Sequence, residues 1–320
     1  MLTAIEIKNY RGIQQGKISG FGQVNLFVGP NGSGKSSLLE AIFLGAVEKS
    51  AEFYFQGLFQ NSRLALIAQR HNESNFPSVD LCYRKNPSPM NPISITYDFG
   101  SEKQSVSIQS APDSSSSFTS NKIPVDSAFF KRMRFLDIRV LLDRGVEQRA
   151  WDQLLNIRGD REIRSVLNKV YGLNIESLTY SANSQTLKAL FADRNYALNI
   201  DDLGAGIRIA FRMMIAILLS EESAVLAEEF DGYQHIESFP RFVSALIQVS
   251  KKAQTQLFLA THSLETVRNF IEQARNGANS IDLRVYQTSL SKDGLFEASS
   301  FSAEEAETLM TGGFDVRRTS

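Results

Sequence analysis

Cysteine, tryptophan and histidine are scarce in this chain of 320 residues, which has one cysteine, one tryptophan and three histidines. Because Cys82 has no second cysteine to pair with, a single chain can hold neither a disulfide framework nor a structural zinc cluster. No apolar stretch reaches the length of a membrane-spanning helix, and the opening MLTAIEIKNYRG lacks the layout of a signal peptide. The sequence therefore predicts a cytoplasmic protein that does not engage a membrane.

An excess of either charge is also lacking. Lys and Arg total 34 against 35 Asp and Glu, which gives a formal net charge of −1 and no global attraction for nucleic acid. Arg158, Arg161 and Arg164 recur at helical spacing. Because Asp160 and Glu162 lie among them, we interpret this segment as a solvated helix face rather than a patch for DNA or a partner. Charge alone therefore does not imply DNA as a partner.

The most informative segment is residues 29–36, GPNGSGKS, which fits the phosphate-binding pattern G-x-x-x-x-G-K-[ST]. An apolar run over 24–28 predicts a strand before it, and residues 37–44 predict a helix after it. The glycines let backbone N–H groups approach a polyphosphate, Lys35 supplies a positive charge to its oxygens, and Ser36 offers a hydroxyl to Mg²⁺. The predicted nucleotide contacts are Gly29, Pro30, Asn31, Gly32, Ser33, Gly34, Lys35, Ser36 and Ser37.

Two adjacent carboxylates, Glu228 and Glu229, follow a second apolar run over 224–227. A strand beside the phosphate loop would point its carboxyl end at the metal and the attacking water. We expect Glu228 to bind Mg²⁺, directly or through water, and Glu229 to orient or deprotonate the water. Since paired acids after a strand are common on protein surfaces, this interpretation depends on the phosphate loop upstream.

A third apolar run, over 257–261, ends at His262. We predict that His262 either accepts a hydrogen bond from the water or donates one to the γ-phosphate, which would make it a sensor of the terminal phosphate. A lone histidine at a strand end is usually structural. The order of the three clusters along the chain favours the catalytic role here.

Residues 202–208, DLGAGIR, open an apolar helix predicted over 209–219. Gly204 and Gly206 at a helix start form a phosphate-sized nest, although a simple turn with an N-cap is the plainer alternative. One nucleotide cannot easily use two cradles on opposite sides of a subunit. The second cradle therefore predicts contact with the nucleotide of a partner subunit.

The rest of the chain alternates between strand and helix patterns. Strand patterns cover residues 2–8, 16–19, 78–83, 93–99 and 104–109, helical patterning runs over 146–171, and a hairpin is predicted over 175–180 with 187–192. The run SAPDSSSSFTSN, residues 110–121, is poor in hydrophobic residues and predicts a flexible loop.

Taken together and in this order, GPNGSGKS, DLGAGIR, VLAEEFDGYQH and FLATHS resemble the phosphate loop, signature loop, Walker B with D-loop, and switch histidine of an ABC-type ATPase head. The opening IEIKNYRGI, followed by VNLFVGPNGSGKSSLLEAI, is typical of the SMC and RecF branch. EEFDGYQH resembles the run EEPEAHQHP of the overcoming-lysogenization-defect class, with Phe230 and Ile236 in place of its prolines. The closing GGFDVR resembles the end of the stand-alone AAA-type ATPases of that class.

This resemblance implies an α/β P-loop NTPase fold with a parallel sheet core, an antiparallel β layer and a helical signature lobe. Residues 1–320 would form a single ABC-type ATPase domain. Within it we expect a β-rich nucleotide-binding lobe over 1–110, a flexible loop over 111–124, a helical and signature lobe over 125–222, and the Walker B and switch-histidine part over 223–320. The glutamine that reports nucleotide state in this fold would be Gln56, Gln60 or Gln69, a choice that the sequence leaves open.

The implied reaction is Mg²⁺-dependent ATP hydrolysis coupled to closing and opening of a homodimer with composite ATP sites. The signature DLGAGIR departs from the transporter pattern, which argues against a transporter. Residues 50–200 lack the heptads of a long coiled-coil arm, which argues against a full SMC protein. The chain ends about 58 residues after His262, which leaves no room for a nuclease domain. We therefore expect an ATPase switch for a separately encoded effector, such as a Toprim-type nuclease in anti-phage defence. The alternatives are a DNA-binding repair ATPase like RecF or SMC, and a nucleotide-dependent scaffold with little turnover, which Glu229 argues against.

Overall fold

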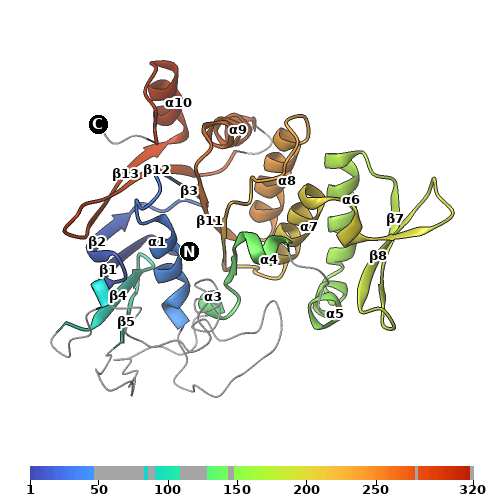
Figure 1. Cartoon of the computed structure of the whole chain (residues 1–320), viewed down its shortest axis with the longest axis horizontal. Helices are drawn as coiled ribbons and strands as arrows, with labels where there is room; N and C mark the ends of the chain where they lie inside the picture. The colour runs from blue at the N-terminus through green and yellow to red at the C-terminus, as the bar shows by residue number, and fades with distance from the viewer. Residues whose placement is uncertain (47–82, 86–90, 109–127, 143–147, 278–279, 318–320) are drawn as a thin grey trace.

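The computed structural model describes residues 1–46, 83–85, 91–108, 128–142, 148–277 and 280–317 (Figure 1). The loop predicted over 111–124 and the three candidate glutamines, Gln56, Gln60 and Gln69, lie outside the described residues, as does most of the strand predicted over 78–83. None of the helices in the described ranges is long and apolar enough to cross a membrane.

The described residues form a mixed α/β fold. Its strands are β1 (Ala4–Tyr10), β2 (Ile13–Ser19), β3 (Val24–Val28), β4 (Ile93–Asp98), β5 (Lys103–Ile108), β6 (Arg134–Leu136), β7 (Ile175–Ser181), β8 (Thr186–Phe191), β9 (Ala197–Asn199), β10 (Ala224–Glu228), β11 (Gln256–Thr261), β12 (Leu283–Leu290) and β13 (Leu295–Ser302). Its helices are α1 (Lys35–Phe43), α3 (Ala128–Lys131), α4 (Ile138–Leu142), α5 (Gln148–Asn156), α6 (Gly159–Tyr171), α7 (Ala205–Leu218), α8 (Phe239–Lys252), α9 (Leu264–Arg275) and α10 (Ala303–Thr311), with the short 3₁₀ helices η1 (Leu44–Ala46), η3 (Tyr83–Lys85) and η4 (Ile200–Asp202).

A ten-stranded sheet in the order β5-β4-β1-β2-β13-β12-β3-β11-β10-β6 forms the centre of the molecule. The strands β12, β3, β11, β10 and β6 pair in parallel, whereas β5, β4, β1 and β2 pair antiparallel. The predicted fold class, a parallel core with antiparallel strands from the N-terminal part, is confirmed. The antiparallel strands continue the central sheet at one end, where Figure 1 shows them beside α1.

Helices cover both faces of the parallel strands, and the side chains of β3 show why. Val24, Leu26 and Val28 belong to one apolar cluster, shared with α7, α8 and α9, while Phe27 belongs to the other, shared with α1. Alternate residues of a strand point to opposite faces, so a strand buried on both faces is mostly apolar, and the one polar residue of β3, Asn25, forms hydrogen bonds with the backbone of Gly22 and Leu257. All five residues of β3 are buried, which fits the apolar run that predicted it.

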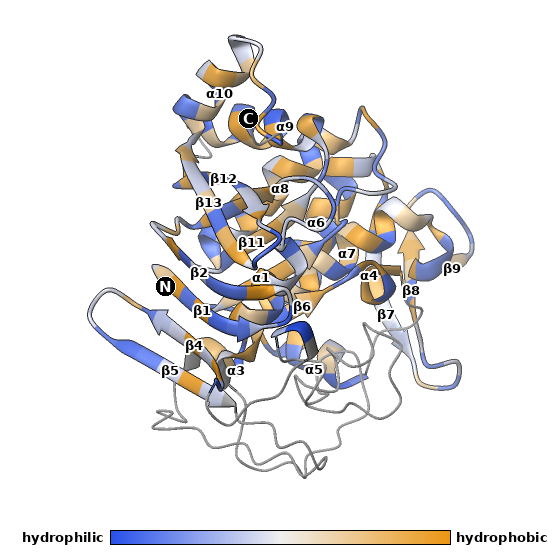
Figure 2. Cartoon of the chain, turned by 60° about the vertical axis from the view of Figure 1, so that its left-hand side comes forward, coloured by the Kyte–Doolittle hydropathy of each residue, from blue (hydrophilic) through white to orange (hydrophobic). Residues whose placement is uncertain are grey.

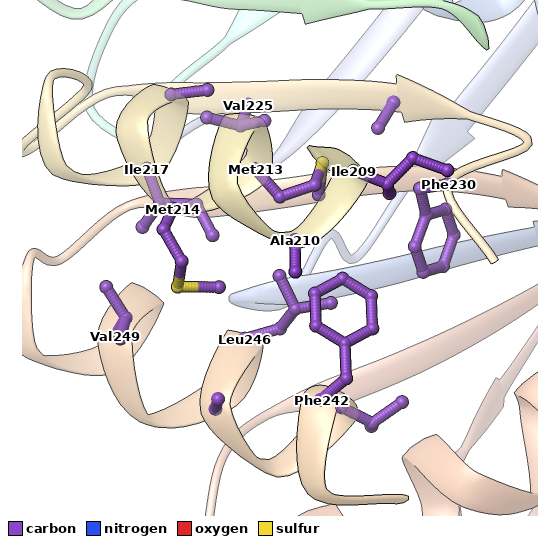
Figure 3. Packing of buried hydrophobic residues seen from close by; sticks show 14 of the residues in the cluster. Ile209, Ala210, Met213, Met214, Ile217, Val225, Phe230, Phe242, Leu246 and Val249 are labelled. Carbon is purple, nitrogen blue, oxygen red and sulfur yellow. The ribbon is translucent and has the colours of Figure 1, made fainter. Parts of the chain in front are cut away.

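Helix α7, which begins at the signature glycines, is the most deeply buried helix near the site. Every residue from Ile209 to Ile217 is buried, and Figure 2 shows its ribbon as largely hydrophobic. In Figure 3, Met213 and Met214 lie between β10 and the apolar side of α8, which presents Phe242, Leu246 and Val249. A helix that is apolar on all sides needs partners on all sides, and the sheet and α8 supply them.

The helical patterning predicted over 146–171 corresponds to two helices, α5 and α6. Arg158 separates them in a left-handed conformation, with φ of 55°. A Cβ at Gly159 would lie 2.6 Å from Leu154 Cδ1, so a side chain near the end of α5 packs closely on the first residue of α6. The predicted strands over 93–99 and 104–109 and the predicted hairpin over 175–192 are confirmed within two residues.

Candidate functional site

Three of the predicted clusters come together at one edge of the sheet. The phosphate loop follows β3, His262 follows β11, and the acidic pair ends β10, and these strands are parallel neighbours in the order β3-β11-β10. The carboxyl ends of parallel strands meet at the same edge, where α/β proteins bind their ligands. The sheet order therefore places the histidine between the phosphate loop and the acids.

The glycines of the phosphate loop occupy positions that a larger residue could not. Gly34 caps α1 in a left-handed conformation, with φ of 88°, and a Cβ there would lie 2.7 Å from the ring of Phe296. A Cβ at Gly29 would lie 2.7 Å from the Thr288 carbonyl oxygen. Strand β12 thus packs against the loop from one side, and the Ser33 and Thr288 hydroxyl oxygens are 2.8 Å apart.

Lys35 opens α1 and folds back over the loop. Its ammonium donates to the carbonyl oxygens of Gly29, at 2.8 Å, and Pro30, at 2.9 Å, and the residue is only 7% exposed. Burial lowers the pKa of Lys35 to about 8, and the nearby Glu228 carboxylate opposes this shift. The loop therefore holds a partly desolvated positive charge with an acidic side chain close enough to act on it.

His262 meets Lys35 at the same acceptor. Its Nδ1 lies 3.1 Å from the Gly29 carbonyl oxygen, which can only accept, so Nδ1 must carry the hydrogen. In the neutral ring Nε2 is then an acceptor. The carbonyl of His262 accepts from Arg317 Nη1 at 3.2 Å, and Asp315 holds the Arg317 guanidinium through both carboxylate oxygens.

The two acids at the end of β10 differ in exposure. Glu228 is half-buried, whereas Glu229 is exposed and left-handed, with φ of 53°. A turn follows, in which the Gly232 N–H donates to the Glu229 carbonyl at 3.1 Å. The structure therefore brings Glu228 toward Lys35 and turns Glu229 outward.

Sequence reasoning gave no role to Asp231 or to the threonines that bind it. The hydroxyls of Thr261 and Thr266 both donate to Asp231 Oδ2, which ties the turn after the acids to β11 and α9. Thr261, a polar residue that ends β11 after an apolar run, is the signal of this contact in the sequence.

The signature glycines lie farther along the sheet. Gly204 caps α7 with φ of 101° and open space around its Cβ position, whereas a Cβ at Gly206 would lie 2.7 Å from the Tyr233 carbonyl oxygen. Helix α7 packs against β10, α6 and α8, and β11 separates β10 from the phosphate-loop strand. The structure thus joins the signature glycines to the turn after the acids.

The residues at this edge fit a nucleotide with Mg²⁺. Added Cβ atoms at Gly29 and Gly34 would have no room in the loop, and the exposed Ser36 follows the buried Lys35. Within the described ranges, no three His, Cys, Asp or Glu side chains gather as a metal cluster. Mg²⁺ in nucleotide sites takes only one or two protein ligands, with phosphates and water completing its shell, so Ser36 and Glu228 are a sufficient pair.

Comparisons with known proteins give the fold. Residues 1–144 match a family model described as an AAA ATPase domain. An SMC head bound to the C-terminal winged-helix domain of ScpA superposes with a TM-score of 0.62 at 16% identity, covering 95% of this chain and 99% of that one. The chain therefore has the fold of an SMC head, and its first 144 residues match an AAA ATPase domain.

Two further SMC heads superpose on this chain. The head from Thermotoga maritima superposes with a TM-score of 0.52 at 15% identity, covering 94% of this chain and 98% of that one. A head with an extended coiled coil bound to the C-terminal domain of ScpA, derived from Pyrococcus furiosus, superposes with a TM-score of 0.57 at 13% identity, covering 97% of this chain and 98% of that one. The chain is also 48% identical over 50 residues to an uncharacterized protein of Methanocaldococcus jannaschii, a match that covers 15% of this chain and 23% of that protein. The chain thus spans about a quarter of the length of that curated relative. Closeness to the overcoming-lysogenization-defect class stays a prediction.

Proposed function

We propose that this ATPase head hydrolyses ATP with Mg²⁺ as a homodimer and acts as a switch on a separately encoded effector. The observation that carries the proposal is that Lys35 and His262 both contact the Gly29 carbonyl oxygen. The carboxylate of Glu228, at the end of β10, opposes the lowering of the Lys35 pKa by burial and so favours the charged form of the lysine. A charged lysine, a polar sensor and an acid at one sheet edge are the groups that phosphoryl transfer requires.

In this mechanism the phosphate loop binds and Lys35 compensates charge. The ammonium of Lys35, now donating to two loop carbonyls, exchanges them for phosphate oxygens. Mg²⁺, held by Ser36 and Glu228, supplies further neutralisation of the phosphates when bound. Because the site is partly desolvated, each of these charges acts more strongly than it would in water.

Glu229 and His262 act on the attacking water. Glu229 is exposed at the sheet edge, where it orients the water and takes its proton. Neutral His262 commits Nδ1–H to the Gly29 carbonyl, so Nε2 accepts a hydrogen bond from the water. Donation from Nε2 to the γ-phosphate would require a protonated ring, so the geometry favours the water-binding role.

The signature glycines act on the nucleotide of a second copy. Gly204 opens α7 with free space at its Cβ position, and helix N-termini attract phosphate. Since β11 separates β10, on which α7 packs, from the phosphate-loop strand, a nucleotide bound at the phosphate loop meets the signature of the partner subunit.

The test separates binding from hydrolysis. Glu229→Gln should keep Mg·ATP binding and slow hydrolysis by about 10²-fold or more, as loss of a general base does. Lys35→Ala should weaken binding itself, because the positive charge at the phosphates is lost. Labelled-ATP binding and turnover assays measure both, with Glu297→Gln, an exposed acid on β13, as the matched control. Near wild-type hydrolysis in Glu229→Gln would contradict its assignment.

The effector we propose is a nuclease of Toprim type in anti-phage defence, supported by the resemblance of EEFDGYQH to the overcoming-lysogenization-defect run. The likeness of the fold to SMC heads favours a second candidate, a DNA-binding repair ATPase. A titration with duplex DNA at physiological salt distinguishes them: the net charge of −1 favours weak binding, whereas a Kd below roughly 10⁻⁷ M would favour the second candidate. Tight ATP binding without turnover would instead indicate a scaffold.

A further inference from the structure

Two side chains outside the predicted site converge on the first turn of the signature helix. Tyr171, at the end of α6, points its hydroxyl at the Gly206 carbonyl oxygen, at 3.1 Å, and at Gln234 Oε1, at 2.8 Å. The Gln234 amide donates to the same Gly206 carbonyl at 3.0 Å. The Gly206 carbonyl therefore lies within hydrogen-bonding distance of two side chains from separate elements, and the single Tyr171 O–H is shared between this carbonyl and Gln234 Oε1.

The backbone is also closely fitted at this point. A Cβ on Gly206 would lie 2.7 Å from the Tyr233 carbonyl oxygen, so the turn after the acids packs directly on α7. Glu229 and Tyr233, which bracket this turn, are both left-handed, with φ of 53° and 63°. Non-glycine residues persist in this conformation only where their surroundings hold them. The bonds from Tyr171 and Gln234 are part of what holds them.

The turn between Glu229 and Gln234 connects the acid, the end of β11 and the signature loop. Glu229 begins it, Asp231 in its middle accepts from Thr261 beside His262, and Gln234 ends it at the signature loop. A shift of α7 would therefore reach the acid, and the strand end that precedes the histidine, through a short, hydrogen-bonded segment.

We propose that Tyr171 and Gln234 are positioning residues that fix the start of α7 against the turn carrying Glu229, so that contact of the signature loop with a partner's nucleotide sets the position of Glu229 in the same subunit. The inference rests on the proposed ATPase function. It adds that the two halves of the composite site are coupled within one subunit through the Gly206 carbonyl.

The experiment removes one hydroxyl. Tyr171→Phe keeps the ring and its packing but loses the single O–H that lies within reach of Gly206 and Gln234, so we expect kcat to fall about three- to tenfold, the effect of one neutral hydrogen bond on a barrier. The Kd for ATP, set at the phosphate loop, should change by less than about twofold. Gln234→Glu keeps the size of the side chain, and its carboxylate still accepts a hydrogen bond from Tyr171, but it cannot donate one to the Gly206 carbonyl. We expect a similar loss of kcat. Since both residues hold one carbonyl, Tyr171→Phe with Gln234→Glu should lose less than the product of the single effects.

Tyr286→Phe is the matched control, because it also removes a buried hydroxyl that donates to a carbonyl, that of Ser19 at 3.3 Å, but on β12. We expect its kcat to stay within about twofold of wild type. Two results with a hydrolysing wild type would overturn the positioning role and leave the proposed function standing. In the first, Tyr171→Phe has the same kcat as Tyr286→Phe. In the second, the kcat of Tyr171→Phe falls only in proportion to its folded fraction, measured by thermal melting. Absence of hydrolysis in wild type overturns both.

Discussion

At Gly29 two side chains from distant parts of the chain share one carbonyl oxygen: Lys35 Nζ at 2.8 Å and His262 Nδ1 at 3.1 Å. Phosphate oxygens are stronger acceptors than a peptide carbonyl because they carry charge. A bound polyphosphate therefore competes for the lysine, and the histidine keeps its contact with Gly29. The two groups respond differently to the same ligand.

The lowered pKa of Lys35 predicts how ATP affinity depends on pH. Burial brings this pKa to about 8 in the free protein, and only the charged ammonium binds phosphate. The Kd for ATP should therefore be nearly constant below pH 8 and rise above it, by about tenfold per pH unit at most, since one proton is involved. Equilibrium binding of labelled ATP between pH 6.5 and about 9.5 measures the slope.

Lys35→Arg provides the comparison, because a guanidinium stays charged throughout this range. Its Kd, although higher, should not depend on pH above 8. A slope shared by wild type and Lys35→Arg would assign the titration to another group.

At this scale the sequence predicts motif residues and misses the contacts between motifs. The spacing in GPNGSGKS is local, so the places of Gly34 and Lys35 follow from the chain itself. The contact of Tyr171 with Gln234 spans 63 positions and depends on how α6 meets the turn after β10. A tyrosine at a helix end carries no mark of such a partner, and folding alone brings the two together.

Among the elements, α7 combines an apolar surface with one buried charge. Arg212 is 1% exposed in the middle of the helix and pairs with Asp201 of η4 at 3.7 Å, just before the signature glycines. Charges in an apolar interior are tolerated only with such partners. The pair therefore ties η4, and with it the approach to the signature loop, to the helix core.

We expect Asp201→Ala to lower the free energy of unfolding by about 3 kcal/mol, because it leaves the buried guanidinium without this carboxylate. Urea denaturation followed by circular dichroism measures the change. Asp193→Ala, which removes an exposed acid 4.0 Å from Arg194, should change it by less than about 0.5 kcal/mol. Equal effects of the two substitutions would show that the Arg212 pair adds no specific stability.

Elements with a strict pattern are predictable, and their interruptions are not. The burial of β4 alternates along the strand, and β3 is buried throughout, so each follows directly from the order of apolar residues. The break between α5 and α6 lies at Arg158, whose left-handed φ of 55° is not marked by any periodicity of apolar residues.

For the whole molecule, the central prediction is a composite site shared by two copies. Gly206→Asp would test it poorly, because its Cβ would press on the Tyr233 carbonyl within the same subunit. Ala205 already has a Cβ at the first turn of α7, where an acid favours the helix while repelling a phosphate. Ala205→Asp should therefore leave ATP binding by each subunit intact and abolish hydrolysis.

Mixing Ala205→Asp with Lys35→Ala restores one intact site in each heterodimer, since that site takes its phosphate loop from one subunit and its signature from the other. With equal mixing, up to about a quarter of wild-type turnover should return, because half of the dimers are mixed and one of two sites works. Turnover by Ala205→Asp alone at the wild-type rate would rule out the signature role. A confirmed mixture with no activity would rule out independent sites.

The position of β3 within the sheet has a consequence for biosynthesis. The phosphate-loop strand pairs with β11 and β12, which the ribosome makes more than two hundred residues later, and Gln256 at the start of β11 binds the backbone of Leu2. Until those strands emerge, the nascent loop has glycines and a lysine but no sheet to hold them. Residues 1–144, which match the family model, therefore cannot assemble this part of the sheet by themselves. We therefore expect a chain that stops before β11 to lack the sheet that supports the phosphate loop, and to bind no nucleotide there.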